Sequence, residues 1–140
     1  MNPVLFDASV YITALRGGQR ALVALRRRES AVPVWLSSVV LEELYAGAGA
    51  TDHAAVGRLE GDFDKARRIL VPNLGDWTQT GKVLALLAAK HGYEQIGRGR
   101  LTNDALIAIS GGRVGITVIT TNARDFARLA EFNSFTWSVL

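Results

Sequence analysis

The stretch Val4-Leu5-Phe6-Asp7-Ala8-Ser9 decides the fold class of this chain. Three consecutive apolar residues follow Pro3 and end at an acid, which is the pattern of a short strand buried on both faces of a parallel sheet. The residues after the strand can cap and begin a helix over residues 9–15, which the glycines at 17 and 18 would stop. A buried strand followed directly by a helix is the repeating unit of an α/β protein.

The same alternation continues along the rest of the chain. Apolar or β-branched runs predict strands over residues 32–36 and 117–120, and an alternating pattern predicts an edge strand over 135–139. Apolar periodicity and capping residues predict helices over 20–29, 38–46, 51–70, 76–91, 103–111 and 123–131, with an extended piece at 71–74 and a loop at 97–100. The expected caps of three helices are Ser37 or Ser38, Asp76 and Thr102. Strands separated by helices predict a mainly parallel central sheet with helices on both faces.

Length and composition predict one folded domain over residues 1–140. A chain of 140 residues that is 49% hydrophobic and 21% charged can bury a sizeable core without disulfides or metal staples, which excludes a disordered chain. The chain has no cysteine, so thiol nucleophiles, iron–sulfur clusters and cysteine-based zinc sites are excluded. Only two histidines, His53 and His91, remain for a histidine-based relay or metal site.

Charge and hydropathy give weaker indications about partners and location. The net charge of +3 is compatible with nucleic acid but is weak evidence by itself. The first residues have no basic segment typical of a signal peptide, and no uncharged apolar run approaches the ~20 residues of a membrane span. We therefore expect a cytoplasmic protein that does not act at a membrane.

Four acids fall where a parallel sheet places its ligands, outside the carboxyl ends of the strands. Asp7 ends the first strand, and Asp125 comes shortly after the strand at 117–120. Asp104 lies in the first turn of a predicted helix. Glu43 lies on the apolar stripe of the helix that begins near residue 38, whereas Glu42 points about 100° away from it.

Each of these acids also has a purely structural interpretation. Asp7 and Asp125 can act as helix caps, Asp104 can stabilise a helix dipole, and Glu43 can lie on a helix face that turns toward solvent. Four carboxylates at one sheet edge, however, repel one another unless cations compensate them. With no cysteine and few histidines, the ligands are hard oxygens, which suit Mg²⁺ or Mn²⁺. Such a site activates water and stabilises charge on an attacked phosphate.

Four segments carry a resemblance to a known family: LFDAS at 5–9, SVVLEELYAG at 38–47, NDALIA at 103–108 and TTNARDF at 120–126. In this order and in a chain of this size, they resemble PIN-domain ribonucleases, specifically the VapC-type toxins of type II toxin–antitoxin pairs. The resemblance covers nearly the whole chain and implies a single PIN-like domain. It also implies metal-binding and catalytic roles for four acids and nearby roles for three polar residues. The acids are Asp7, Glu43, Asp104 and Asp125, and the residues that position the metal or its water are Ser9, Thr120 and Asn122.

The family varies at the fourth acid position, so either Asp125 or Asn122 can complete the metal site, and we favour Asp125. The resemblance further implies an endoribonuclease that uses Mg²⁺ or Mn²⁺ to cut single-stranded or loop RNA, often in tRNA or ribosomal RNA. Its members form homodimers and are neutralised by a small VapB-type antitoxin.

RNA contacts are expected from basic residues near the acids. Arg98, Arg100 and Arg124 are placed to hold phosphates, although a solvated loop explains the first two equally well. Trp35 and Trp77 are expected to pack in the core or at an interface rather than to stack on bases.

The alternative to an enzyme is a non-catalytic α/β binding module with an acidic pocket. One form is a receiver-like domain, which would place paired acids after the first strand and a lysine after the last parallel strand. Here Ala8 follows Asp7, and no lysine follows Lys90. The other form is a domain that binds RNA without cutting it. A flap-type DNA nuclease would need a helical arch for which the chain is too short.

Overall fold

The computed structural model describes residues 2–17, 19–49, 52–93 and 100–140. Within these residues one five-stranded sheet forms, in the order β3-β2-β1-β4-β5, and every neighbouring pair of strands is parallel. The strands are β1 (Val4–Phe6), β2 (Val34–Ser37), β3 (Ile69–Leu70), β4 (Thr117–Thr120) and β5 (Trp137–Val139). The predicted α/β class with a parallel central sheet is therefore confirmed.

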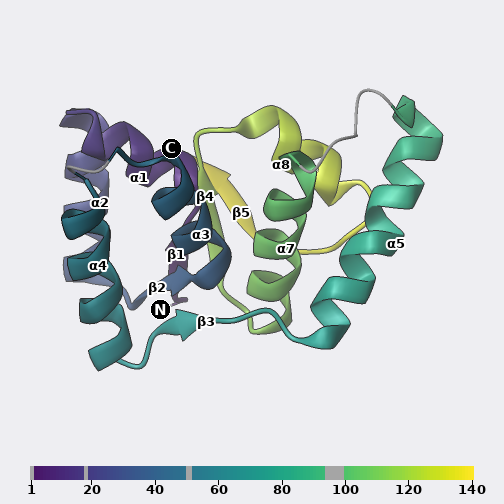
Figure 1. Cartoon of the computed structure of the whole chain (residues 1–140). Coiled ribbons are helices and arrows are strands. Elements are labelled where there is room, and N and C mark those ends of the chain that lie inside the picture. Colours follow the sequence, from purple (N-terminus) through teal and green to yellow (C-terminus); the bar gives the residue numbers. More distant parts are fainter. Residues whose placement is uncertain (1, 18, 50–51, 94–99) are drawn as a thin grey trace.

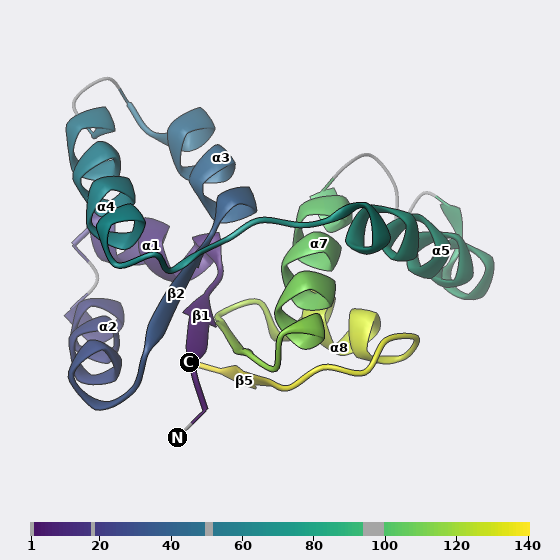
Figure 2. The same ribbon diagram turned by 90° about the horizontal axis from the view of Figure 1, so that it is seen from below.

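Helices cover both faces of this sheet. Figures 1 and 2 show the strands between two groups of helices, with α1, α2 and α4 on one side and α5, α7 and α8 on the other. The helices are α1 (Ala8–Leu15), α2 (Gln19–Ala31), α3 (Ser38–Gly47), α4 (His53–Lys65), α5 (Leu74–His91), α7 (Arg100–Arg113) and α8 (Ala123–Ala130). Helix α3 directly follows β2 and contacts α1, α4 and α7.

Strand β1, which contains the apolar run that predicted the fold class, lies at the centre of the sheet. Leu5 is opposite Trp35 of β2 and Val118 of β4, and both Leu5 and Phe6 are completely buried. The pairing continues past the strand, because the backbone N–H of Asp7 donates to the carbonyl of Ile119 at 3.0 Å. The core on both faces of β1 therefore fixes the position of Asp7 at the carboxyl edge of the sheet.

The predicted helix over 51–70 is wrong after residue 65. Helix α4 ends at Lys65, and Arg67 adopts a positive φ of 55°, which ends a right-handed helix. The chain then reverses, and Ile69–Leu70 pairs with β2 as an edge strand. The extended piece expected at 71–74 is shorter, because Leu74 already begins α5.

Two predicted helix starts are also wrong. Helix α7 begins at Arg100, so Thr102 lies inside the helix and does not cap it. Helix α5 is capped by Asn73, with Asp76 as the reciprocal partner of a capping box. Asp76 is buried as well, and its carboxylate accepts from the guanidinium of Arg113 on α7. By contrast, Ser37 caps α3 as expected, accepting from the backbone N–H of Val39 at 3.1 Å.

Candidate active site

The candidate site lies where β1 and β4 end side by side. Asp7 follows the last residue of β1 and Thr120 is the last residue of β4. The hydroxyl of Thr120 donates to Oδ2 of Asp7 at 2.6 Å, and the hydroxyl of Ser9 donates to Oδ1. Asp7 stands at the N-cap position of α1, but its carboxylate makes no side-chain capping bond. The backbone N–H groups of Ser9 and Val10 add a smaller stabilisation of its charge, so capping alone does not explain this acid, whose two oxygens are oriented by two hydroxyl groups.

Burial sets the electrostatics of Asp7. Its side chain is only 3% exposed, and burial raises the pKa of the carboxyl above its ordinary value. Hydrogen bonds from Ser9 and Thr120 act in the opposite direction and offset part of the rise. Asp7 is thus a buried carboxylate, held in place by neutral donors and lacking an ion pair with any described lysine or arginine.

Glu43 contributes a second carboxylate from α3, and this residue is half-buried. Its Oε1 atom is buried and has no hydrogen-bond partner. Burial, the nearby charge of Asp7 and the charge of Glu42 together raise the pKa of Glu43 from 4.5 to about 7. Glu42, one residue earlier, is exposed, as the helical-face argument predicted. Helix α3 begins directly after β2 and contacts α1, so Glu43 lies at the same carboxyl edge of the sheet as Asp7.

Asp104 lies on α7, the helix that packs against α3. It is half-buried and follows Asn103, whose side-chain amide donates to Oε2 of Glu42 at 3.1 Å. The adjacent pairs Glu42–Glu43 and Asn103–Asp104 are therefore linked across the two helices. This contact between Asn103 and Glu42 is not among the sequence predictions, because it depends on how α3 and α7 pack.

Asn122 and Asp125 extend the network from the end of β4. The backbone N–H of Asn122 donates to the hydroxyl of Thr120 at 2.8 Å, and its side-chain amide donates to Oδ2 of Asp125 at 2.8 Å. Asn122 also caps α8 by accepting from the backbone N–H of Asp125. A chain of hydrogen bonds thus runs from Asp7 through Thr120 and Asn122 to Asp125. The cap of α8 is therefore Asn122 and not Asp125, which lies in the first turn of the helix and is connected to Asp7 through Asn122 and Thr120.

The structure describes the three candidate RNA-binding arginines to different extents. Arg98 lies outside the described residues, and the loop expected at 97–100 is described only at Arg100, which is helical and begins α7. Arg124 is exposed in the first turn of α8, between Asn122 and Asp125. Only Arg124 is thus described as an exposed cation beside the network.

The side-chain atoms available as ligands determine whether the site can hold a divalent metal ion. Among the described residues, no three His, Asp or Glu side chains are close enough together to hold an ion by themselves. Hard oxygen atoms are nevertheless provided by the carboxylates of the buried Asp7 and the half-buried Glu43, with its unpartnered Oε1, and by the hydroxyls of Ser9 and Thr120. Mg²⁺ commonly takes one or two protein carboxylates and completes its coordination with water and substrate phosphate. The residues present therefore fit Mg²⁺ or Mn²⁺ as a partly hydrated ion.

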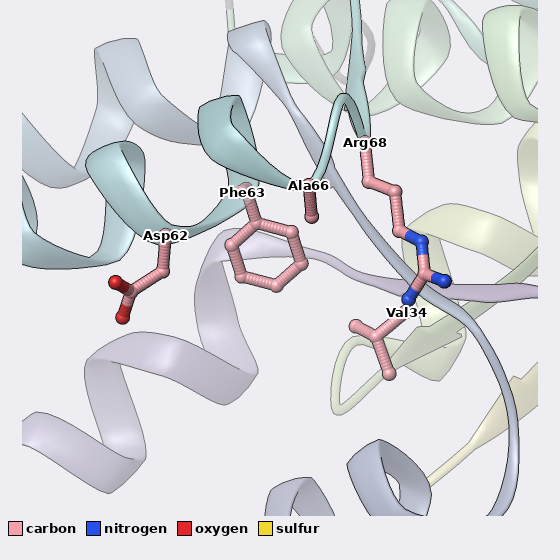
Figure 3. Close-up of a pocket in the computed structure, with 5 residues that line it drawn as sticks. All are labelled: Val34, Asp62, Phe63, Ala66 and Arg68. Carbon is pink, nitrogen blue, oxygen red and sulfur yellow. The ribbon is translucent and has the colours of Figure 1, made fainter.

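A small pocket of about 180 Å³ lies at the opposite end of the sheet. It is lined by Val34, Asp62, Phe63, Ala66 and Arg68. Figure 3 shows Phe63 between the end of α4 and Val34, with the carboxylate of Asp62 directed away from the ring. Val34 begins β2, so this pocket lies at the amino ends of the strands, whereas ligands of parallel sheets bind at the carboxyl ends. It contributes nothing to the site at Asp7.

In the part of the chain that the structure describes, no helix has the length and apolarity needed to cross a membrane.

Comparison with known proteins identifies the family. Among solved structures, the chain is similar to a DNA-bound VapBC from Salmonella typhimurium, with 22% identity and a TM-score of 0.69 over 99% of this chain and 98% of that chain. It is also similar to VapBC2 from Rickettsia felis bound to a promoter DNA fragment, with 18% identity and a TM-score of 0.70 over 99% and 98% of the two chains. VapBC-1 from nontypeable Haemophilus influenzae gives 22% identity and a TM-score of 0.66 over 98% and 97%.

At these identities the likeness concerns the fold. No curated protein sequence matches the chain. The PIN domain family model, however, matches residues 4–132, which include all four candidate acids. The match covers most of the chain, and the chain therefore belongs to the PIN-domain family.

Proposed function

We propose that this protein is a metal-dependent endoribonuclease toxin of the VapC type, which hydrolyses phosphodiester bonds in structured RNA such as tRNA or ribosomal RNA. The observation that carries the proposal is the pair formed by the buried Asp7 and the half-buried Glu43, whose Oε1 atom is buried. Within the described residues, neither carboxylate forms an ion pair with a lysine or arginine, and Oε1 of Glu43 has no hydrogen-bond partner. Burying such groups costs stability unless a bound cation compensates them. Family membership and the location at the carboxyl sheet edge support the same interpretation.

In this mechanism the chain holds the ion and positions the RNA. Asp7 and Glu43 would hold Mg²⁺ or Mn²⁺, with Asp104 and either Asp125 or Asn122 completing the site. A bound ion supplies an activated water and stabilises the negative charge that develops on the attacked phosphate. Ser9 and Thr120 each donate to one oxygen of Asp7 and thereby fix its orientation.

The substrate phosphates lie outside the acids in this proposal. Arg98, Arg100 and Arg124 would bind the RNA backbone, which positions a chain without specifying its sequence. Fixed positive charge beside the acids also offsets the repulsion between their carboxylates and an incoming phosphate.

The proposal includes protein partners. Two of the similar solved structures are VapBC complexes bound to DNA, and a third is a VapBC complex. By this likeness in fold we propose a VapB-type antitoxin as the neutralising partner of this chain, a homodimer as its assembly and the cytoplasm as its location. A small neighbouring reading frame that encodes a DNA-binding antitoxin would support this partner, and co-purification of the two products would test it directly.

Cleavage of RNA by charge-neutral variants tests the enzyme. Asp7→Asn and Asp104→Asn keep the side-chain shape but remove one carboxylate each, so both should reduce Mg²⁺-dependent cleavage of total tRNA at least about 100-fold. Asp64→Asn is the control, because Asp64 is an exposed acid on α4. Circular dichroism establishes that each variant is folded. Cleavage by either folded variant at the wild-type rate would refute the assignment.

Metal titration separates the enzyme from a non-catalytic binding module. We expect calorimetry to show Mg²⁺ or Mn²⁺ binding to the wild type and weaker binding to Asp7→Asn. A wild-type protein that binds RNA but neither metal, with or without RNA present, would instead support the binding module.

A further inference from the structure

A second cavity, of about 310 Å³, lies at the same sheet edge as the acids. Its walls come from the residues that follow β2 and β3 and from α5 and α7, and they include Ser38, Glu42, Val71, Pro72, Trp77 and Asn103. The volume is at the lower end of the roughly 300–1,000 Å³ typical of small-molecule sites. Because the carboxyl ends of parallel strands form the ligand-binding edge, this cavity is placed where a substrate group would lie.

One wall of the cavity is aromatic and open to solvent. Trp77, in the first turns of α5, is 54% exposed, and Val71 beside it on the cavity wall is 62% exposed. Trp77 is therefore not packed in the core, which was one of the two places expected for it, and packing at an interface stays a prediction. An exposed indole that lines a cavity offers a flat apolar face, and such faces bind single-stranded nucleic acids by stacking on their bases. Pro72 adds a second rigid apolar surface.

Another part of the cavity lining is polar and adjoins the acid site. Glu42 and Asn103 line the cavity and are joined by the 3.1 Å hydrogen bond. Each directly precedes a candidate metal-binding acid, Glu43 on α3 and Asp104 on α7. Each of these two packed helices thus contributes to the cavity a residue that directly precedes one of the candidate acids. A group bound in the cavity would therefore lie beside the proposed cleavage site.

We propose that this cavity binds an unpaired base of the RNA substrate, with Trp77 stacking on the base and Glu42 accepting hydrogen bonds from its Watson–Crick edge. The inference rests on the proposed ribonuclease function and adds a specificity site to it. RNA is read in this way when unpaired bases stack on aromatic side chains and bond through their edges. Glu42 retains acceptor capacity after bonding to Asn103, because a carboxylate has about four acceptor positions.

The chemistry of the wall favours guanine. The Watson–Crick edge of guanine presents two adjacent donors, N1–H and the N2 amino group, to which a carboxylate can accept in parallel. Adenine and cytosine place an acceptor beside their amino group, and uracil flanks its one donor with two acceptors, so each of them sets an acceptor against the carboxylate. The amide of Asn103 adds a donor for the O6 atom of guanine.

Binding of short RNA without cleavage tests the site. Fluorescein-labelled U-rich hexanucleotides that carry one central guanine, adenine, cytosine or uracil are titrated with the full chain in EDTA, and anisotropy gives each Kd. We expect the guanine hexamer to bind several-fold more tightly than the other three. Trp77→Ala should weaken guanine binding about fivefold or more, since loss of stacking on one base has effects of this size. Trp77→Phe should restore most of the affinity.

Two further variants separate stacking from edge recognition. Glu42→Gln should reduce the preference for guanine over adenine while leaving the stacking contribution in place. Leu86→Ala is the control, because Leu86 is an exposed apolar residue further along α5 and does not line the cavity. It should bind all four hexamers like the wild type.

The outcomes distinguish this inference from the proposed function. A wild type that neither binds nor cuts RNA would refute the ribonuclease itself. A wild type that cuts RNA, while Trp77→Ala and Glu42→Gln keep its affinity and its base preference, would refute only the base-binding site. Sedimentation velocity is run on each variant. If Trp77→Ala also converts a dimer to a monomer, the cavity is a contact between copies of the chain and the inference is overturned.

Discussion

Replacing Glu43 by glutamine should remove a pH-dependent loss of stability in the metal-free protein. The folded chain holds Glu43 with a pKa of about 7, against an ordinary value of 4.5. Between these two values the folded state retains a proton that the unfolded state has lost. Stability therefore falls as the pH rises through this interval and levels off above the folded-state pKa. A neutral glutamine has no such proton and removes this part of the pH dependence.

The size of the effect follows from the same pair of pKa values. A rise from 4.5 to about 7 corresponds to about 3 kcal/mol when no solvent screening is considered. Glu43 is only half-buried, so water screens its charge and reduces the penalty to about 1–2 kcal/mol. In EDTA, Glu43→Gln should therefore exceed the wild type by about 1–2 kcal/mol at about pH 8 and by less than about 0.5 kcal/mol at about pH 5.

Urea unfolding followed by circular dichroism measures this difference at both pH values. Asp64→Asn, at an exposed acid, should follow the wild type at each pH. Millimolar Mg²⁺ should raise the stability of the wild type more than that of Glu43→Gln, because a ligand that binds only the folded state stabilises it by mass action. A difference between wild type and Glu43→Gln that does not change with pH would refute the electrostatic reasoning.

Four further substitutions test other contacts. Thr120→Val removes the 2.6 Å donor to Asp7, so RNA cleavage should fall about tenfold or more while the chain stays folded, as kinetics and circular dichroism would show. Arg113→Met leaves the buried Asp76 carboxylate without its cation and should lower the free energy of unfolding in urea by about 2–4 kcal/mol. Gly112→Ala should lower the free energy of unfolding by about 1–3 kcal/mol, because the new Cβ would lie 3.0 Å from the Cβ of Phe135. Gly61 on α4 has open space around it, so Gly61→Ala should raise the free energy of unfolding by about 0.5–1 kcal/mol in the same assay. Unchanged RNA cleavage by Thr120→Val would contradict the first prediction, and an unchanged urea midpoint of Arg113→Met would contradict the second. Equal effects of the two glycine-to-alanine substitutions would contradict the third.

The alternation of strands and helices was predictable because it depends on local pattern. The buried run at Val4–Phe6 and the β-branched run at Thr117–Thr120 specify strands without reference to the rest of the chain. The strand Ile69–Leu70 was missed, since two residues carry too little periodicity to separate them from the helical pattern before them. They form a strand by pairing with Leu36 and Ser37, and this pairing exists only in the folded chain.

In the candidate site, too, features set by local sequence were predictable, and features set by the packing of distant segments were not. The helical face of Glu43 and the end of the strand at Asp7 follow from spacing alone, and the structure agrees with the burial expected for Glu43 and Glu42. The contact of Asn103 with Glu42 and the cavity beside Trp77 depend on how α3, α5 and α7 pack. Composition cannot show that an aromatic residue stays exposed, because tryptophan in a helix is usually buried by its neighbours.

The acids removed from solvent in this chain differ in whether a cation of the chain compensates their charge. This difference separates an acid with a structural role from acids with a proposed functional role. Asp76 is buried, but Arg113 and the capping bond with Asn73 compensate its charge, so its role in holding α5 against α7 is complete within the chain. Asp7 is buried with two hydroxyl donors, Glu43 is half-buried with a buried, unpartnered Oε1 atom, and no described cation pairs with either of them. Selection for stability alone would favour a neutral residue at such positions. Carboxylates retained under this cost are expected where a ligand supplies the missing positive charge.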